Sequence, residues 1–183
     1  MELHLIRHPR PDVLPGVCYG STDVGLVDPP TTAARRLRAL LPDTFELYAS
    51  PLTRARLLAE ELGRPRLDPR LAEMHFGDWE LMPYSELGSA IDAWADDPLG
   101  FCAPGGESAS EMAARALEWL NELSERDSHI PVVVVAHGGP LRAITGHLLG
   151  LPRERWLSLD FAFARSTRID IQEWGANLQW FNL

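Results

Sequence analysis

The sequence predicts an α/β fold, a three-layer sandwich in which helices flank a mainly parallel central sheet and a C-terminal β-hairpin lies at its edge. Three observations carry this prediction. Segments typical of strands and of helices alternate along the chain. Residues 132–135 are four valines, as in a strand buried on both faces of a parallel sheet. Residues 165–183 alternate apolar and polar positions around a Gly-Ala-Asn turn at 175–177, which is typical of a hairpin.

The chain begins with a predicted strand–loop–helix unit. Residues 2–6 are mostly apolar and are expected to form a buried strand. Residues 12–30 are expected to be loop, because glycine and proline recur through them. Residues 31–41 carry apolar side chains at helical spacing and predict a helix.

A second strand–helix unit and a less regular segment follow. Residues 45–50 predict a short strand that leads into a helix, with Ser50 as its N-cap and Pro51 at its first position. Glycine and proline punctuate the residues up to 107, where we expect a short helix over 84–95. We interpret residues 74–107 as an insertion that covers the substrate.

The second half contains the two most regular segments. Residues 107–126 predict a long amphipathic helix that Ser108 or Ser110 can cap. Residues 131–150 predict the valine strand, a Gly-Gly turn and a helix that opens with Pro140.

Length and composition favour a single domain over residues 1–183, with a globular share of apolar residues. The net charge of −9 disfavours a nucleic-acid or anionic-membrane surface, and all 17 basic residues are arginine. Cys18 and Cys102 are too few for a disulfide framework. With no signal peptide or apolar span, we expect a cytoplasmic protein, and no feature indicates an oligomeric state.

Chemically distinctive residues follow three of the predicted strands. His8 follows the first strand, residues 50–54 follow the second, and His137 follows the valine strand. Ligands of open parallel sheets bind beyond the carboxyl ends of the strands, close to helix N-termini. We therefore expect Arg7, His8, Arg54 and His137 to meet in one crevice.

Two guanidinium groups and two imidazoles in one crevice suit phosphoryl transfer. Arginine offers a planar fork that matches phosphate oxygens. A neutral histidine can attack phosphorus in line, while the cationic groups stabilise the charge on the equatorial oxygens. This chemistry depends mainly on positioning and electrostatics, so we expect neither metal nor cofactor, and the six histidines lack metal-ligand spacing.

Five segments resemble the histidine phosphatase superfamily, the phosphoglycerate mutase-like phosphatases. They are "LIRHP", "YASPLTRARLLAEEL", "LAEMHFGDWE", "PGGES" and "VVVVAHGGPLRAI". They occur in the order and spacing of that family, and the resemblance runs from Met1 to Asn182.

The resemblance implies roles for individual residues. His8 would be the nucleophile that becomes phosphohistidine, and Glu73 would be the general acid and then the general base. The residues expected to bind the phosphate are Arg7, Arg54, His137, Tyr19, Gly20 and Gly138.

Some positions leave alternatives open or depart from the family. Asp78, Glu80 and Glu107 are rivals of Glu73 for the proton. Pro9 replaces the usual glycine and has no N–H for the phosphate. Other conspicuous side chains have structural interpretations: we expect His4, His75, His129 and His147 to be structural, Arg142 to make surface ion pairs, and the tryptophans to pack in the core, although Trp79 and Trp94 could border the site.

The resemblance is greatest to the α-ribazole phosphatase branch, which removes a 5′-phosphate late in cobalamin assembly. It implies a metal-independent phosphomonoesterase for a small molecule, with α-ribazole 5′-phosphate as the candidate substrate. The alternatives are a broad-specificity phosphatase of sugar phosphates or nucleotides and a phosphoglycerate mutase-like enzyme. A phosphate-sensing or protein-directed regulatory module is the alternative that is not an enzyme.

Overall fold

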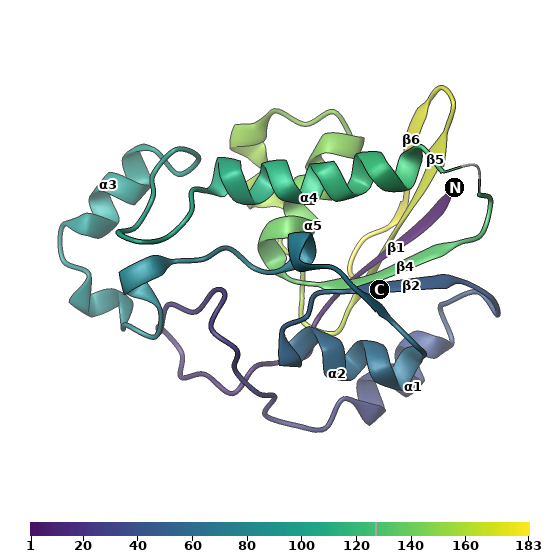
Figure 1. Cartoon of the computed structure of the whole chain (residues 1–183), viewed down its shortest axis with the longest axis horizontal. Coiled ribbons are helices and arrows are strands. Elements are labelled where there is room, and N and C mark those ends of the chain that lie inside the picture. The colour runs from purple at the N-terminus through teal and green to yellow at the C-terminus, as the bar shows by residue number, and fades with distance from the viewer. Residues whose placement is uncertain (127) are drawn as a thin grey trace.

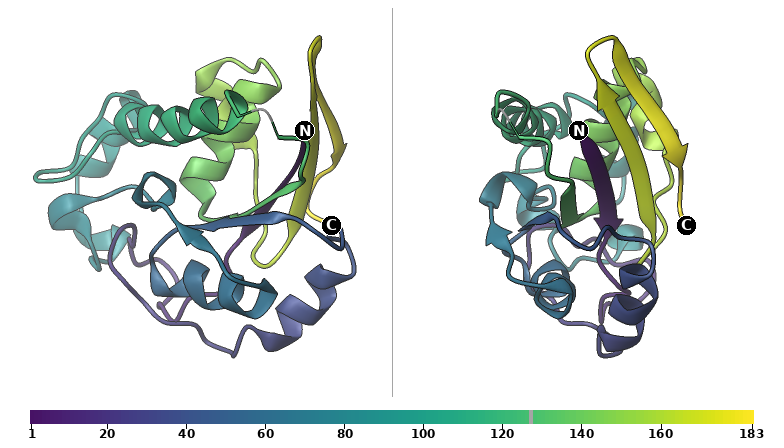
Figure 2. Two further views of the ribbon diagram at one scale, coloured as in Figure 1. Left: turned by 45° about the vertical axis from the view of Figure 1, so that its right-hand side comes forward. Right: turned by 90° about the vertical axis from the view of Figure 1, so that its right-hand side faces the viewer.

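A computed structural model gives the structure of the chain and describes residues 1–126 and 128–183. A six-stranded sheet has the order β3-β2-β4-β1-β5-β6. The first four strands of that order are parallel, and β5 and β6 add an antiparallel hairpin at one edge (Figures 1 and 2). The strands are β1 (Glu2–Arg7), β2 (Glu46–Ala49), β3 (Arg66–Leu67), β4 (Val132–Ala136), β5 (Ser166–Gln172) and β6 (Gly175–Trp180). The predicted α/β class is confirmed, and β3 is a strand that we did not predict.

Helices cover both faces of the sheet and complete three layers. One face is covered by α1 (Thr31–Arg38) and α2 (Thr53–Leu62), the other by α4 (Ala109–Ser124) and α5 (Gly138–Leu148) (Figure 1). The valine side chains of β4 pack into the cores on both faces of the sheet, because successive side chains of a strand point to opposite faces. Val133 and Val135 pack with α1 and α2.

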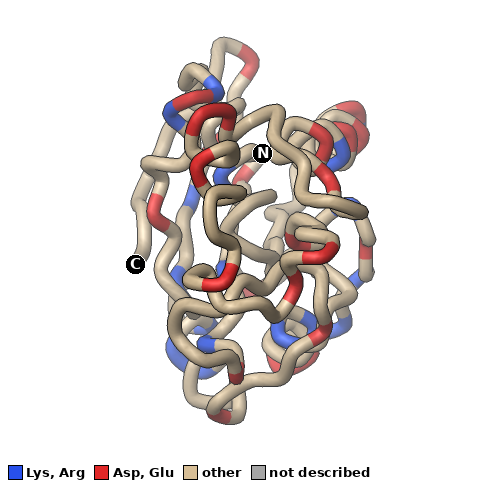
Figure 3. The backbone as a smooth tube through the Cα atoms, turned by 90° about the vertical axis from the view of Figure 1, so that its left-hand side faces the viewer, with Lys and Arg blue, Asp and Glu red and all other residues tan. Residues whose placement is uncertain are grey.

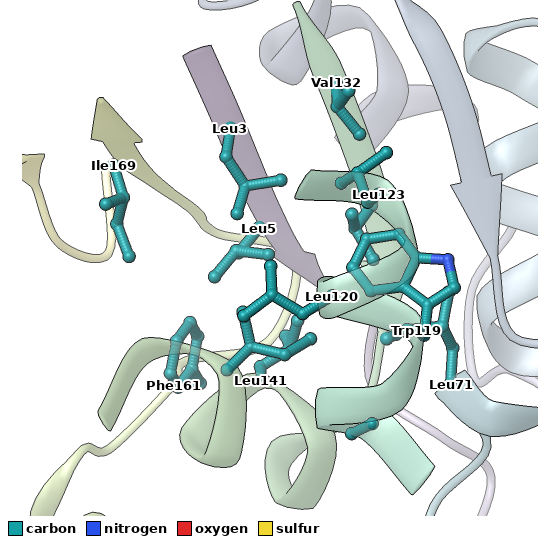
Figure 4. Close-up of a cluster of buried hydrophobic side chains, with 14 residues drawn as sticks. Leu3, Leu5, Leu71, Trp119, Leu120, Leu123, Val132, Leu141, Phe161 and Ile169 are labelled. Atoms are coloured by element: carbon teal, nitrogen blue, oxygen red, sulfur yellow. The ribbon is translucent and has the colours of Figure 1, made fainter. Parts of the chain in front are cut away.

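The larger core lies between the sheet and the helices α4 and α5 (Figure 4). The apolar face of α4 contributes Ala116, Trp119, Leu120 and Leu123 to this core, and Met112 is buried nearer the start of the helix. The residues of this core include Leu3, Leu5, Leu71, Trp119, Leu120, Leu123, Val132, Leu141, Phe161 and Ile169. This packing fixes the strands and α5 rigidly, and both carry residues of the predicted site.

Several predicted boundaries are wrong. Helix α5 begins at Gly138, so the two glycines lie in its first turn and Pro140 is its third residue. Helix α2 begins at Thr53, and Ser50 and Pro51 lie in the connection before it. The hairpin turns at residues 173–174, and the Gly-Ala-Asn sequence lies inside β6. The expected helix over 84–95 is divided into a 3₁₀ turn, Tyr84–Glu86, and helix α3, Ala90–Asp96.

The segment 74–107 lies beyond the carboxyl ends of the parallel strands, around α3 in Figure 1. It contains 3₁₀ turns at Gly77–Trp79 and Tyr84–Glu86, and it packs around its own small apolar cluster, in which Cys18 meets Trp79 and Leu87. Acidic positions dominate the loops at this end of the molecule (Figure 3), and the sequence has no lysine or arginine between Arg70 and Arg115.

There are two further 3₁₀ helices. Pro69–Leu71 precedes the segment 74–107, and Arg153–Ser158 follows α5. None of the helices in the described ranges is long and apolar enough to cross a membrane.

Candidate active site

The register of the sheet places three polar residues side by side at the carboxyl ends of neighbouring strands. Arg7 pairs with Ala136 and Ala49 pairs with Val135, so β1, β2 and β4 end side by side. The next residues along the three strands are His8, Ser50 and His137, and all three are buried. The predicted meeting of the strand ends is therefore observed.

His8 is held as a neutral base. Its Nδ1 lies 2.6 Å from the carbonyl oxygen of Pro9. A carbonyl only accepts, so Nδ1 carries the proton and Nε2 keeps its lone pair. Burial, together with the cations of Arg54 and Arg7, lowers the pKa of His8 to about 3. The proline that departs from the family thus supplies, through its carbonyl, the partner that fixes the tautomer.

His137 lies beside His8, with ring centroids 4.9 Å apart. Its Nε2 lies 2.7 Å from the hydroxyl oxygen of Ser50, and its Nδ1 is buried without a partner among the described residues. Burial and the proximity of His8 lower the pKa of His137 far below its usual range. Both imidazoles are therefore uncharged at neutral pH.

Arg7 is fixed by an aromatic ring and a carbonyl. Its guanidinium carbon lies 3.9 Å from the ring centroid of Phe163, and an Nη donates to the carbonyl of Phe161 at 2.5 Å. The same Phe163 ring lies 5.4 Å from that of His8. Phe163 therefore positions both members of the Arg-His pair, and its packing orients the Arg7 cation without neutralising it.

Arg54 is fully buried at the start of α2. Its two Nη groups donate to the carbonyl oxygens of Gly20 and Thr22, the latter at 2.8 Å. Its guanidinium carbon also lies 5.3 Å from the ring centroid of Tyr19. Among the described residues, the hydrogen bonds of Arg54 go only to neutral carbonyl groups, so its positive charge is not neutralised by a hydrogen-bonded carboxylate.

Three nitrogen atoms of this group have no hydrogen-bond partner in the described part of the chain. They are Nε of Arg7, Nε of Arg54 and Nδ1 of His137. Buried polar atoms are nearly always satisfied in folded proteins, so three unsatisfied donors on neighbouring side chains need an explanation, and a bound anion supplies one. Together with the lone pair on Nε2 of His8, these donors make the site suited to a tetrahedral anion.

A cavity of about 240 Å³ adjoins Arg7 and contains Glu73 in its wall. The Glu73 carboxylate accepts from the N–H groups of Met74 and Gly139, both at 3.1 Å. Gly139 is the second residue of α5, so Glu73 is tied to the helix that His137 precedes. This position suits an acid that meets the leaving group.

The three rival carboxylates are engaged elsewhere. Glu80 accepts hydrogen bonds on both oxygens from the backbone around Gly20. Glu107 binds Arg115 at 2.6 Å, and Asp78 is exposed and outside the cavity wall. Geometry therefore favours Glu73 among the four candidates.

The three remaining predicted phosphate-binding residues lie around the same group. Tyr19 lines the cavity, and burial raises the pKa of its hydroxyl. Gly138 opens α5, where first-turn N–H groups lack intrahelical acceptors. Gly20 binds differently from our expectation, because its N–H donates to Glu80 and its carbonyl accepts from Arg54. Phosphate contact by these three stays a prediction.

Sequence reasoning missed several residues of the site. Ser50 was expected to cap a helix, and Gly139 and Phe163 were not singled out. Arg142 lies 3.9 Å from the exposed Asp160, as a surface ion pair would, but it also lines the cavity. The available signal was position: Ser50 follows a strand end, and Gly139 lies one residue beyond Gly138.

The structure also shows where the predicted tryptophan and histidine side chains lie relative to the cavity. Trp94 lines the cavity as expected, whereas Trp79 packs against Phe101 in the small cluster. His4 is buried in β1 with its Nε2 2.7 Å from Glu2, which is a structural role. In residues 1–126 and 128–183, no three His, Cys, Asp or Glu side chains are grouped so that they could hold a metal ion.

Comparison with known proteins agrees with this geometry. A glucosyl-3-phosphoglycerate phosphatase of Mycolicibacterium vanbaalenii is 40% identical over 111 residues, which span 54% of this chain and 49% of that protein. An adenosylcobalamin/alpha-ribazole phosphatase of Escherichia coli is 29% identical over 194 residues, which span 100% of this chain and 96% of the relative. The crystal structure of an alpha-ribazole phosphatase from Shigella flexneri has a TM-score of 0.90 at 27% identity, covering 100% of this chain and 96% of that one. Residues 3–183 match the histidine phosphatase superfamily (branch 1), so the chain belongs to that superfamily and is a phosphoric monoester hydrolase.

Proposed function

We propose that this phosphatase acts through a phosphohistidine at His8 and needs no metal ion. One observation carries the proposal: a neutral His8 with a free Nε2 lies among buried cationic and N–H donors that have no partner in the described structure. The arginines supply the positive charge that a metal supplies in other phosphoryl-transfer sites.

The reaction divides into two transfers at phosphorus. In the first, Nε2 of His8 bonds to phosphorus while the bond from phosphorus to the leaving oxygen breaks, and Glu73 gives its proton to that oxygen. In the second, Glu73 takes a proton from water, the water oxygen bonds to phosphorus, and the bond to Nε2 breaks. Arg7, Arg54 and His137 hold the equatorial oxygens in both steps.

For the substrate, we propose α-ribazole 5′-phosphate, an aromatic nucleoside phosphate. The end-to-end similarity to alpha-ribazole phosphatases supports it. The cavity beside the phosphate site supports it too, because its wall is largely apolar and aromatic, with Phe76, Tyr84 and Trp94 among its residues. The segment 74–107, which supplies these rings, would cover the substrate.

A second candidate is a phosphate ester whose leaving group carries a carboxylate. The guanidinium of Arg142 lines the same cavity, and a carboxylate is the natural partner of that group. The glucosyl-3-phosphoglycerate phosphatase relative supports this candidate. A panel that contains both esters, together with simple sugar phosphates and nucleotides, separates a specific enzyme from a broad one.

The surroundings of the enzyme are also part of the proposal. A cytoplasmic location is supported by the free thiols of Cys18 and Cys102, the second of which is exposed. The net charge of −9 supports a small-molecule partner in place of nucleic acid or an anionic membrane.

The decisive experiment substitutes His8. We expect His8→Ala to abolish release of phosphate from p-nitrophenyl phosphate in the presence of a chelator, and wild-type protein to form a phosphoenzyme that is labile in acid and stable in alkali. His147→Ala, an exposed histidine on α5, is the matched control and should retain wild-type turnover. Turnover by His8→Ala would remove the nucleophile, and loss of wild-type activity with the chelator would remove the metal-independent mechanism.

A further inference from the structure

Glu80 is a carboxylate whose two oxygens are saturated by donors. Its Oε1 accepts from the N–H of Ser21 at 2.9 Å, the N–H of Phe76 at 3.0 Å and the hydroxyl of Ser21 at 3.3 Å. Its Oε2 accepts from the N–H of Gly20 at 2.9 Å, the N–H of Thr22 at 3.2 Å and the hydroxyl of Thr22 at 2.6 Å. The pKa of Glu80 is lowered because these hydrogen bonds outweigh the effect of burial. Glu80 is therefore ionised and has no free lone pair directed at a substrate.

The loop that Glu80 binds is the same loop that binds Arg54. Gly20 donates its N–H to Glu80 and accepts from Arg54 at its carbonyl, and Thr22 does the same. The carboxylate and the guanidinium thus hold the two sides of one short backbone segment, residues 20–22. The peptide unit between Gly20 and Ser21 is bound by both charges, because its carbonyl accepts from Arg54 and its N–H donates to Glu80. The two charges polarise this unit in the same sense, which strengthens both hydrogen bonds.

The loop has no space in which to move toward the segment 74–107. A Cβ atom on Gly20 would lie 2.0 Å from the carbonyl oxygen of Met74, 2.5 Å from the ring of Phe76 and 2.8 Å from Oε1 of Glu80. The absence of a side chain at Gly20 lets the backbone approach Glu80 closely. The position of the loop is consequently set by Glu80 and its neighbours.

We propose that Glu80 is a positioning residue, which fixes the Arg54 guanidinium in the phosphate site through the carbonyl groups of residues 20–22. The inference rests on the proposed function and goes beyond it, because it places a determinant of phosphate binding in the segment that also lines the leaving-group cavity. Glu80 does not touch the substrate. Its carboxylate acts by holding the two carbonyl groups that accept from the Nη groups of Arg54, which leaves the buried Nε of Arg54 without a partner in the described structure and available to the phosphate.

The test compares Glu80→Gln with Glu86→Gln, an exposed carboxylate of the same segment. An amide at position 80 directs N–H groups at backbone donors, so Arg54 loses its fixed place. We expect Glu80→Gln to lower kcat/KM about 10- to 100-fold, the range for hydrogen bonds to a charged group. Competitive inhibition by inorganic phosphate should weaken in parallel, and Glu86→Gln should match the wild type in both measurements.

The choice of substrates separates positioning from proton donation. p-Nitrophenolate leaves without a proton, whereas an alkoxide needs one. Glu80→Gln should therefore slow p-nitrophenyl phosphate and an alkyl phosphate by the same factor, whereas Glu73→Gln should slow the alkyl phosphate far more. A selective effect of Glu80→Gln on the alkyl phosphate would overturn the proposal and make Glu80 the acid.

A double-mutant cycle tests whether the effect passes through Arg54. In the Arg54→Gln background, Glu80→Gln should weaken phosphate binding little further, measured by calorimetry with inorganic phosphate. Full additivity of the two effects would overturn the proposal. If Glu80→Gln fails to fold, Thr22→Val carries the test, because it removes only the 2.6 Å hydroxyl donor; it should weaken phosphate binding several-fold, and unchanged binding would count against the inference. A wild type that binds phosphate but shows no turnover would instead contradict the proposed function.

Discussion

At the scale of single residues, the two histidines of the site are prepared by neighbours that differ in kind. A backbone carbonyl, that of Pro9, holds Nδ1 of His8. A side-chain hydroxyl, that of Ser50, lies at Nε2 of His137, and the same oxygen accepts from the N–H of Leu52 at 3.2 Å. The Ser50 hydroxyl can thus donate its proton to Nε2 of His137, an arrangement that leaves the proton of the neutral ring on Nδ1. The buried Ser50 therefore favours the tautomer in which Nδ1 of His137 can donate a hydrogen bond.

This arrangement predicts that Ser50→Ala lowers kcat/KM about 5-fold, because one buried hydrogen bond contributes about 1 kcal/mol. Competition by inorganic phosphate, followed with p-nitrophenyl phosphate, should weaken by a similar factor. Ser166→Ala is the matched control, since the Ser166 hydroxyl is buried without a partner in the described structure. Equal activity of the two variants would show that His137 needs no support from Ser50.

The residues of the site differ in how far the sequence could predict them. The meeting of Arg7, His8, Arg54 and His137 followed from strand ends and helix starts, which local sequence indicates. The tasks of Ser50 and Phe163 depend on side-chain contacts between segments far apart in the chain. No periodicity or propensity encodes such contacts, so only the fold could reveal them.

At the scale of elements, the helices show why some boundaries were predicted and others were not. Helix α4 begins with a local device, a capping box between Ser108 and Glu111. Helix α2 has no such device: the N–H and hydroxyl of Thr53 donate to the carboxylate of Asp23 at 2.7 and 2.8 Å. Asp23 is 30 residues away in the chain, so the start of α2 is set by a tertiary contact.

The capping box predicts a difference between two nearby serines, Ser108 and Ser110. The Ser108 hydroxyl accepts from the N–H of Glu111, whose carboxylate accepts from the N–H of Ser108 at 2.7 Å. Ser108→Ala should lower the free energy of unfolding by about 1 kcal/mol and the melting temperature by about 2–4 °C. Ser110→Ala should leave both near the wild-type values, because its side chain is outside the box. Equal losses in thermal and urea unfolding would place the cap elsewhere.

The hairpin and β3 were mispredicted for related reasons. Gly175 and Asn177 have turn chemistry, but pairing of Gln172 with Gly175 leaves only two residues, 173–174, for the turn. The register that pairs Ile169 with Leu178 outweighs the local preference. The two-residue strand β3 exists only because it pairs with β2, and two residues are too few to give a pattern.

At the scale of the whole molecule, folding withdraws two imidazoles from water between the sheet and the loops at its carboxyl end. His8 is 1% exposed and His137 is 0% exposed. Protonation would place a positive charge on a buried ring, where water cannot solvate it. Both rings also lie beside arginine cations that oppose a further positive charge. The machinery that keeps His8 nucleophilic therefore links the stability of the fold to pH.

This linkage predicts that the fold loses stability in acid. Below pH 6.5 the unfolded chain protonates its histidines, whereas folded His8 stays neutral down to about pH 3, so the free energy of unfolding must fall as the pH falls through this window. At pH 5.5 each fully buried ring should contribute a loss of about 1 kcal/mol. Glu46 and Asp68, whose pKa values are lowered by arginine partners, lose their contribution only at lower pH.

Urea unfolding at pH 7.5 and pH 5.5 measures this loss. The loss should shrink by about 1 kcal/mol in His8→Gln, because one titrating ring has been removed. His147→Gln, an exposed ring on α5, should keep the wild-type loss. If His8→Gln lost as much stability as the wild type, protonation of His8 would be as easy in the folded chain as in the unfolded one, and the neutral nucleophile on which the mechanism depends would need another explanation.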